Sequence, residues 1–146
     1  MVRLPASTNV KRDGSCNSGF GMSLRCLIVD DNPGFGHAVR SLLEGQGIAV
    51  VGIATSGAEA DLSVQELRPE VALVDIDLGE ESGFDVARRL AGGVRPTSPK
   101  VILISTHDEH EFADLIEVSP AVGFLAKTDL SAATIRRLLA EADDST

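Results

Sequence analysis

Three carboxylates and one ammonium group stand at the ends of apolar runs in this sequence. Asp30 and Asp31 follow LRCLIV, Asp75 falls within VALVDI, and Lys127 follows VGFLA. A single aspartate after a strand is ordinarily a turn residue or a helix cap. Three that converge would repel one another and resist ionisation. A hard divalent cation relieves that repulsion, and a few carboxylates with several waters are typical of Mg²⁺. The cluster therefore predicts a magnesium site.

A pair of hydroxyl residues extends this chemistry. Ser105 and Thr106 follow the apolar core of KVILIS, and Lys127 is one of three lysines in the chain. A carboxylate nucleophile, a metal ion, an ammonium and a hydroxyl together meet the needs of phosphoryl transfer. During this transfer negative charge is spread over the phosphoryl oxygens, and cations and hydrogen-bond donors stabilise it. Apart from the nucleophile, the protein takes little part in the covalent chemistry. These residue types therefore favour phosphoryl transfer.

The elements that must position these residues alternate along the chain. Short aliphatic runs predict strands, and apolar residues at helical spacing, such as Phe35 and Val39, predict helices. The expected strands are 24–29, 48–54, 71–76, 100–105 and 122–126, and the expected helices are 33–44, 57–68, 84–91, 109–118 and 129–141. Ser56 is expected to cap the second helix, and Asp129 or Ser131 the last.

This alternation predicts an α/β protein whose parallel sheet is covered by helices on both faces. We expect the flavodoxin-like (βα)5 three-layer sandwich, a five-stranded parallel sheet of order 2-1-3-4-5. In that order ligands bind where the carboxyl ends of the first and third strands meet. Asp30, Asp31 and Asp75 would then converge, with Ser105 and Lys127 at the same edge.

Composition limits the domain organisation and the class of partner. With 146 residues the chain is long enough for one core. We expect a disordered N-terminal tail over 1–21, one domain over 22–142, and a short acidic tail over 143–146 with no output domain. The net charge of −9 argues against binding nucleic acid or anionic membranes. No apolar run suits a membrane span or a signal peptide, so we expect a cytoplasmic protein whose Cys26 is a core residue.

Four runs, CLIVDDNP, LVDIDLGEESG, ILIST and GFLAKTDL, occur in this order at the predicted strand ends. Together they closely resemble the receiver domains of two-component response regulators, the CheY-like superfamily, over about 22–142. The resemblance implies that Asp75 accepts a phosphoryl group from a sensor histidine kinase or a histidine phosphotransfer protein. It implies Mg²⁺ as cofactor, with Asp31 and Asp75 as direct ligands, Asp30 acting largely through water, and the backbone carbonyl of Asp77 as a further ligand.

The resemblance also implies roles for residues around the phosphoryl group. Lys127 would pair with it, Ser105 would hydrogen-bond it, and Phe124 would be the aromatic that rotates on activation. That rotation would switch the face of the fourth helix, fifth strand and fifth helix, which would bind a downstream protein target or a second copy of the chain. Three residues, Asp77, Thr106 and His107, would control access to the phosphoryl group and its lifetime.

Three positions depart from the usual receiver pattern. Gly79 and Thr128 stand where prolines are common, and Thr106 is bulkier than the usual alanine. A non-proline cis bond is costly, so we expect a trans bond before Thr128. We expect a switch that catalyses only its own phosphotransfer and dephosphorylation.

Two other functions are alternatives. One is a pseudo-receiver, a binding module that uses this fold without being phosphorylated. The other is a haloacid-dehalogenase-like phosphatase that uses Asp75 as nucleophile and Asp77 as acid/base. In that phosphatase family, however, the Asp-x-Asp motif opens the first strand and a separate acidic pair comes late in the chain. Here the acidic pair, Asp30 and Asp31, comes first, and Asp75 and Asp77 come later.

Overall fold

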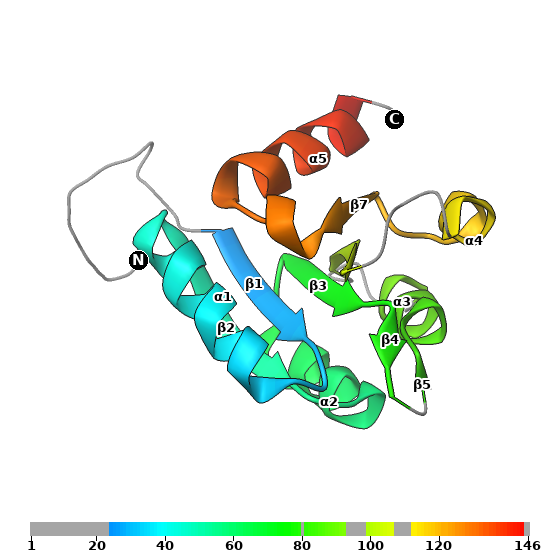
Figure 1. The fold of residues 1–146 in the computed structure, drawn as a ribbon, viewed down its shortest axis with the longest axis horizontal. Coiled ribbons are helices and arrows are strands. Elements are labelled where there is room, and N and C mark those ends of the chain that lie inside the picture. The colour runs from blue at the N-terminus through cyan, green and yellow to red at the C-terminus, as the bar shows by residue number, and fades with distance from the viewer. Residues whose placement is uncertain (1–23, 80, 93–98, 107–111, 145–146) are drawn as a thin grey trace.

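The computed structural model describes residues 24–79, 81–92, 99–106 and 112–144, and its centre is one parallel sheet (Figure 1). The five strands of that sheet are β1 (Leu24–Val29), β2 (Ile48–Ala54), β3 (Val71–Asp75), β6 (Lys100–Ser105) and β7 (Gly123–Ala126). They lie in the order β2-β1-β3-β6-β7, and every neighbouring pair is parallel. With β6 and β7 as the fourth and fifth predicted strands, the predicted order 2-1-3-4-5 is confirmed.

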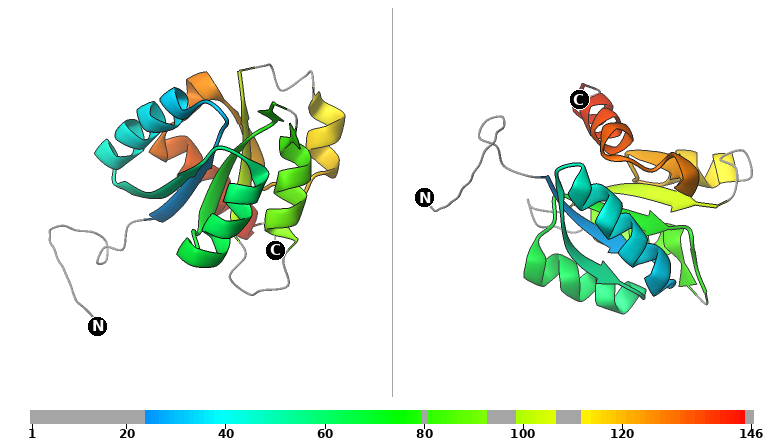
Figure 2. Two further views of the ribbon diagram at one scale, coloured as in Figure 1. Left: turned by 90° about the horizontal axis from the view of Figure 1, so that it is seen from below. Right: turned by 60° about the vertical axis from the view of Figure 1, so that its left-hand side comes forward.

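Helices cover both faces of the sheet, which makes the three layers of the predicted sandwich (Figure 2). The helices are α1 (Pro33–Gly45), α2 (Gly57–Leu67), α3 (Gly83–Ala91), α4 (Ala113–Val118) and α5 (Ala132–Asp144). Residues of α1 and α5 share one apolar cluster, and residues of α2, α3 and α4 share the other. No helix within the described ranges is long and apolar enough to cross a membrane.

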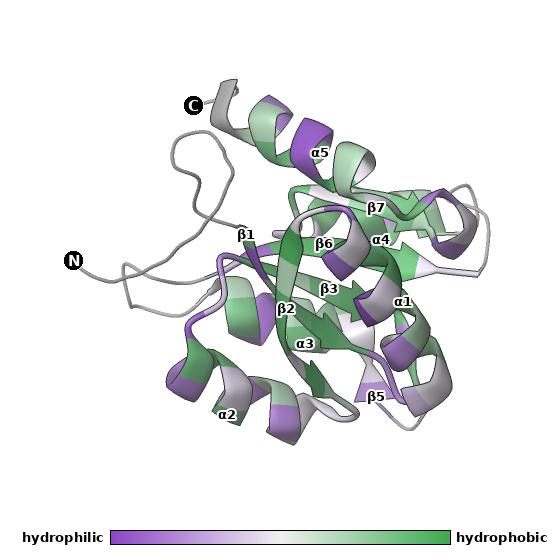
Figure 3. Ribbon diagram, turned by 90° about the vertical axis from the view of Figure 1, so that its left-hand side faces the viewer, coloured by the Kyte–Doolittle hydropathy of each residue, from purple (hydrophilic) through white to green (hydrophobic). Residues whose placement is uncertain are grey.

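The core consists of the aliphatic strands between these helices. Figure 3 shows apolar strands enclosed by helices whose hydrophilic residues face outward. Leu27, Ile28, Leu73 and Leu103 are fully buried. The predicted core position of Cys26 is confirmed, because it is fully buried and burial raises the pKa of its thiol to about 12.

Side-chain caps explain where α1, α2 and α5 begin. Asn32 Oδ1 accepts hydrogen bonds from the amides of Gly34 and Phe35 at the start of α1. The predicted cap Ser56 accepts one from Glu59 N at 3.2 Å. Of the two caps proposed for the last helix, Ser131 is the one used, since its Oγ accepts from Thr134 N at 3.2 Å.

Several predicted boundaries were wrong by one to three residues. The strand predicted over 71–76 ends at Asp75, and the one predicted over 122–126 begins at Gly123. The last helix covers Ala132–Asp144 instead of 129–141, because 127–129 form a separate 3-10 turn. The expected tail 143–146 is therefore helical at its first two residues. The part of the predicted fourth helix over 109–111, and the expected tail 1–21, lie outside the described residues.

A small hairpin was missed by the sequence analysis. Strands β4 (Asp77–Leu78) and β5 (Glu81–Ser82) pair antiparallel in the stretch predicted to be a loop after β3. Gly79 takes a φ of +74° in the turn between them, in the left-handed region that favours glycine. The hairpin holds the segment between Asp75 and α3 beside the end of the sheet.

Candidate functional site

The register of the sheet brings the predicted carboxylates together. β1 and β3 pair in parallel with Val29 opposite Val74, so the next residues, Asp30 and Asp75, leave the sheet side by side. One carboxylate oxygen each of Asp30, Asp31 and Asp75 lies within 4.8 Å of the other two. Asp30 and Asp75 are buried, whereas Asp31 is exposed. The predicted three-carboxylate cluster is thus present at the carboxyl ends of β1 and β3.

Lys127 joins the two buried carboxylates. Its Nζ donates to Asp30 Oδ2 at 2.7 Å and to Asp75 Oδ2 at 3.1 Å. The second oxygen of each carboxylate accepts from a nearby backbone amide. Asp30 Oδ1 accepts from Asn32 N at 2.8 Å, and Asp75 Oδ1 accepts from Asp77 N at 3.0 Å. Both buried carboxylates therefore have hydrogen bonds at each oxygen, as buried charges require.

Burial and neighbouring charges act in opposite directions on these groups. Burial raises the pKa of Asp75, the negative charge of Asp30 adds to that rise, and hydrogen bonds from Asp77 N and Lys127 only partly oppose it. For Lys127, burial lowers the pKa, but the hydrogen bonds and charges of Asp30 and Asp75 outweigh burial and leave its pKa raised. Lys127 is therefore held in its charged form, and the acidic cluster still favours an additional cation.

The cluster opens into a polar cavity of about 280 Å³, large enough for a hydrated ion and a phosphoryl group. The lining residues are Asp30, Asp31, Asn32, Asp75, Asp77, Gly79, Ser105, Thr106 and Lys127. Oxygen donors dominate this lining, and hard oxygen donors are what Mg²⁺ prefers. The donor set therefore fits the cofactor that the sequence analysis predicted.

Ser105 and Phe124, the two residues predicted to act in switching, lie on neighbouring strands β6 and β7. Ser105 is buried at the end of β6, at the wall of the cavity. Phe124 does not line the cavity. It lies on β7, where it pairs with Leu103 of β6, and it packs against the apolar cluster that includes α3. Leu103 is two residues before Ser105 on β6. Because side chains two apart in a strand share a face, Ser105 and Phe124 are on the same side of the sheet. His107 is outside the described residues.

The orientation of Asp77 bears on the phosphatase alternative. Its Oδ1 accepts a hydrogen bond from Gly79 N at 3.3 Å, within the β4–β5 hairpin. An acid/base partner for a nucleophile at Asp75 would direct its carboxylate at the reacting group. Asp77 is exposed and lines the cavity, and one of its two carboxylate oxygens serves the turn.

Sequence analysis missed two contacts, one made by Phe35 with a site residue and one made by Glu81 of the hairpin that follows Asp75. The ring centroid of Phe35, in the first turn of α1, lies 4.0 Å from Lys127 Nζ. Glu81 Oε1 accepts from Gly57 N at 2.6 Å, and its Oε2 lies 3.7 Å from Arg89 Nη2, so Glu81 ties the hairpin to α2 and α3. The helical spacing of Phe35 in the sequence indicates that it faces the core, but it does not indicate contact with Lys127.

Known proteins resemble this chain in sequence and in fold. The family model described as "Response regulator receiver domain" matches residues 26–139. The response regulator GacA of Pseudomonas protegens is 31% identical over 105 residues, which are 71% of this chain and 48% of that protein. The signal receiver domain of a modulated diguanylate cyclase from Desulfovibrio desulfuricans is 33% identical with a TM-score of 0.69, covering 83% of this chain and 94% of that one.

A further solved structure supports the fold alone. The CheY-like receiver domain protein of Methanospirillum hungatei is 21% identical, with a TM-score of 0.68 over 84% of this chain and 96% of that one. The chain spans about half the length, or less, of the first curated relatives it matches. The similarity therefore concerns one domain of those longer proteins.

Proposed function

Because the chain belongs to the response regulator receiver domain family, we propose that it is a signalling switch phosphorylated on Asp75. The donor is a sensor histidine kinase or a histidine phosphotransfer protein. One observation carries this proposal above the others: three carboxylates converge within 4.8 Å while Lys127 donates to two of them.

The proposed reaction transfers a phosphoryl group without any proton leaving Asp75. An oxygen of the Asp75 carboxylate attacks phosphorus, and the bond from phosphorus to the donor breaks, with its electron pair leaving on the donor. Lys127 lies beside Asp75 Oδ2, where it can neutralise the oxygens of the incoming group. The product is an acyl phosphate, and attack by water returns the carboxylate and inorganic phosphate.

Mg²⁺ would be held by Asp31, Asp75 and the backbone carbonyl of Asp77, with Asp30 acting through water. When bound, it neutralises charge that builds up on the phosphoryl oxygens. Two features of this chain support the assignment. Asp31 is exposed to the cavity, whereas Asp30 already accepts from Asn32 N and Lys127.

Phosphorylation by a small donor is the direct test. Incubation with acetyl phosphate and Mg²⁺ is expected to add the mass of one phosphoryl group to the intact chain, and hydroxylamine is expected to remove it. Chelating the metal before adding the donor is expected to prevent the gain. Intact-protein mass spectrometry measures both. A chain that binds Mg²⁺ but gains no phosphoryl group would instead be a pseudo-receiver, and a metal-independent label would contradict the assigned site.

The proposed output is a change of packing behind β6. The phosphoryl group carries about −1.5 to −2 charge where the Asp75 carboxylate carried −1, and its oxygens draw donors towards them. If Ser105 moves towards the phosphoryl group, Phe124 on the same side of the sheet is the large side chain able to fill the space. The surface formed by α4, β7 and α5 would then change between two packings. On α4, Leu115 and Val118 are exposed, and apolar residues of this kind suit contact with a protein target.

Beryllofluoride, a mimic of the phosphoryl group, tests this output. With Mg²⁺ it is expected to shift amide resonances of Ser105, Phe124 and 112–118, measured by NMR. Ser105→Ala is expected to retain phosphorylation by acetyl phosphate while the shifts at Phe124 and α4 shrink. Shifts confined to the neighbourhood of Asp31 and Asp75 in the parent chain would show that this face is not the output surface.

A further inference from the structure

Lys127 has a third partner that carries no charge. The aromatic ring of Phe35 lies under its ammonium, with the ring centroid 4.0 Å from Nζ. Resting on the function proposed above, we infer that Phe35 is a positioning residue for Lys127. The ring holds the ammonium over the site while Mg²⁺ and the phosphoryl group occupy the carboxylates. Phe35 contacts neither the metal nor the reacting atoms, so its effect passes through Lys127.

The need for such a partner follows from competition for the same oxygens. In the structure Lys127 donates to Asp30 Oδ2 and Asp75 Oδ2. One of these belongs to the proposed phosphoacceptor and the other to the cluster that would surround the cation. When Mg²⁺ draws on both carboxylates, before a phosphoryl group has supplied new oxygens, both partners of the ammonium are weakened together. An ammonium held only weakly would turn towards water on its flexible four-carbon chain.

An aromatic ring meets this need in a way that another carboxylate would not. Its negative face attracts a cation within about 6 Å of the centroid. It offers no oxygen to a hard metal ion, so it does not compete for Mg²⁺, and without a full charge it repels an incoming phosphoryl group far less than a carboxylate would. The side chain of Lys127 is only 13% exposed, and cation–π attraction grows when the cation is shielded from water.

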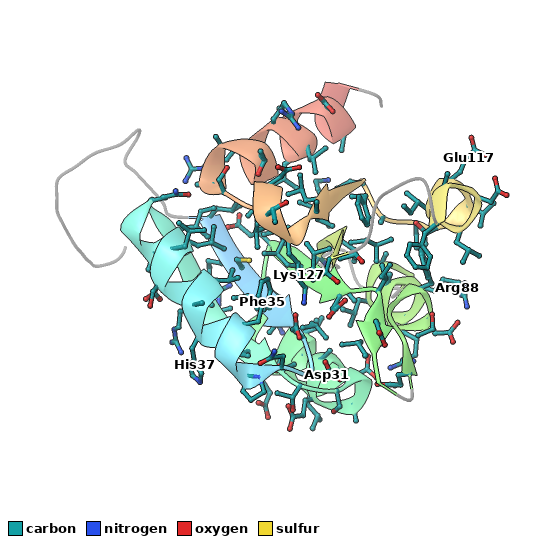
Figure 4. All side chains as sticks on the ribbon, viewed as in Figure 1. Asp31, Phe35, His37, Arg88, Glu117 and Lys127 are labelled. Carbon is teal, nitrogen blue, oxygen red and sulfur yellow. The ribbon has the colours of Figure 1, made fainter. Side chains whose placement is uncertain are left out.

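The start of α1 fixes the ring in this place. Asn32 Oδ1 accepts from Phe35 N at 3.2 Å, so the cap that begins the helix directly after Asp31 also holds the backbone of Phe35. The ring is half-buried and packs against the apolar cluster of α1 and α5. Figure 4 shows Phe35 beside Lys127, while His37 on the same helix points away from them.

Ring-current shifts test the contact without measuring activity. The ε-methylene protons of Lys127 are expected to resonate upfield of ordinary lysine values in the metal-free chain, and to stay upfield after Mg²⁺ and beryllofluoride are added. Assignment is simple because the chain has only two other lysines, Lys11 and Lys100. Phe35→Leu is expected to abolish the upfield shift, and the matched control His37→Leu to keep it. Loss of the shift when Mg²⁺ and beryllofluoride bind the parent chain would overturn the inference.

A fluorine series separates the charge effect from packing. Mono-, di- and trifluorinated phenylalanine at position 35 keep the ring's shape but progressively weaken its negative face. The rate of phosphorylation by acetyl phosphate with Mg²⁺ is expected to fall stepwise, by about fivefold over the series, a size typical of one cation–π contact. Unfolding temperatures are expected to stay constant. Equal rates across the series would overturn the inference. A parent chain that is never phosphorylated would refute the proposed function, and the ring-current measurement with Mg²⁺ would still decide the role of Phe35.

Discussion

Asp75→Asn is expected to abolish phosphorylation by acetyl phosphate to background. Asparagine has nearly the same shape, and its amide oxygen can still accept from Asp77 N, as Asp75 Oδ1 does at 3.0 Å. It lacks the anionic oxygen that attacks phosphorus. Lys127 keeps its bond to Asp30. The change therefore removes the nucleophile while leaving the local structure in place, and intact-protein mass spectrometry measures the loss.

The same variant has an expected effect on stability whose sign follows from burial. Because burial raises the pKa of Asp75, folding favours the protonated carboxyl, and the ionised form costs stability. That cost is absent below the pKa of an unfolded aspartate, grows as pH rises through the raised folded pKa, and is constant above it. Asp75→Asn should therefore be at least as stable as the parent at pH 7, and its relative advantage should shrink as the pH is lowered.

A matched control uses an aspartate outside the cavity. Asp85 is exposed on α3 and forms an ion pair with Arg88. Asp85→Asn is expected to be phosphorylated at the parent rate. Retention of one hydroxylamine-labile phosphoryl group in Asp75→Asn would contradict the assignment, because it would place the acceptor on another residue.

Gly83→Ala is expected to give the largest loss of stability among single-methyl additions. A Cβ at Gly83 would overlap the carbonyl oxygen of Asp75 and lie 2.5 Å from Ile76 Cα. These are backbone atoms next to the proposed acceptor, and they cannot rotate away as a side chain can. Overpacking costs about 1–3 kcal/mol, and a backbone clash places this change near the upper end. At about 3 kcal/mol the unfolding temperature should fall by roughly 10 °C.

The variant is also expected to slow phosphorylation, because any shift that relieves the clash must move the backbone of Asp75 or the start of α3. Gly83 N donates to Ile76 O at 2.9 Å, so α3 begins directly on this turn. Gly45→Ala is the matched control, since a Cβ there would meet nothing within 4 Å. Its stability is expected to be equal to the parent's or up to about 1 kcal/mol higher, because alanine is the better helix residue. Equal unfolding temperatures for the two variants would contradict this account of how α3 supports the site.

Much of the fold and of the candidate site followed from local patterns. Aliphatic runs of strand length alternate with helical spacing, and such periodicity depends only on which face of an element is buried. The handedness of parallel connections then leaves few strand orders. Asp30, Asp75 and Lys127 could be predicted to meet because each ends a strand of one parallel sheet. The cap Ser56 was predictable for the same reason, since a cap depends on its own helix end.

Other features depended on contacts that no local pattern records. The β4–β5 hairpin has two residues per strand, too few for a period, and its Glu81 contacts the start of α2, far away in the sequence. The helical spacing of Phe35 predicted a position facing the core. Only the packing of α1 against the sheet decided that its ring lies under Lys127, a residue far away in the sequence. The sequence by itself determined the elements and the chemistry at their ends, because periodicity and strand-end residues are local. The tertiary structure alone decided which side chains touch between elements, because that depends on how whole elements pack together.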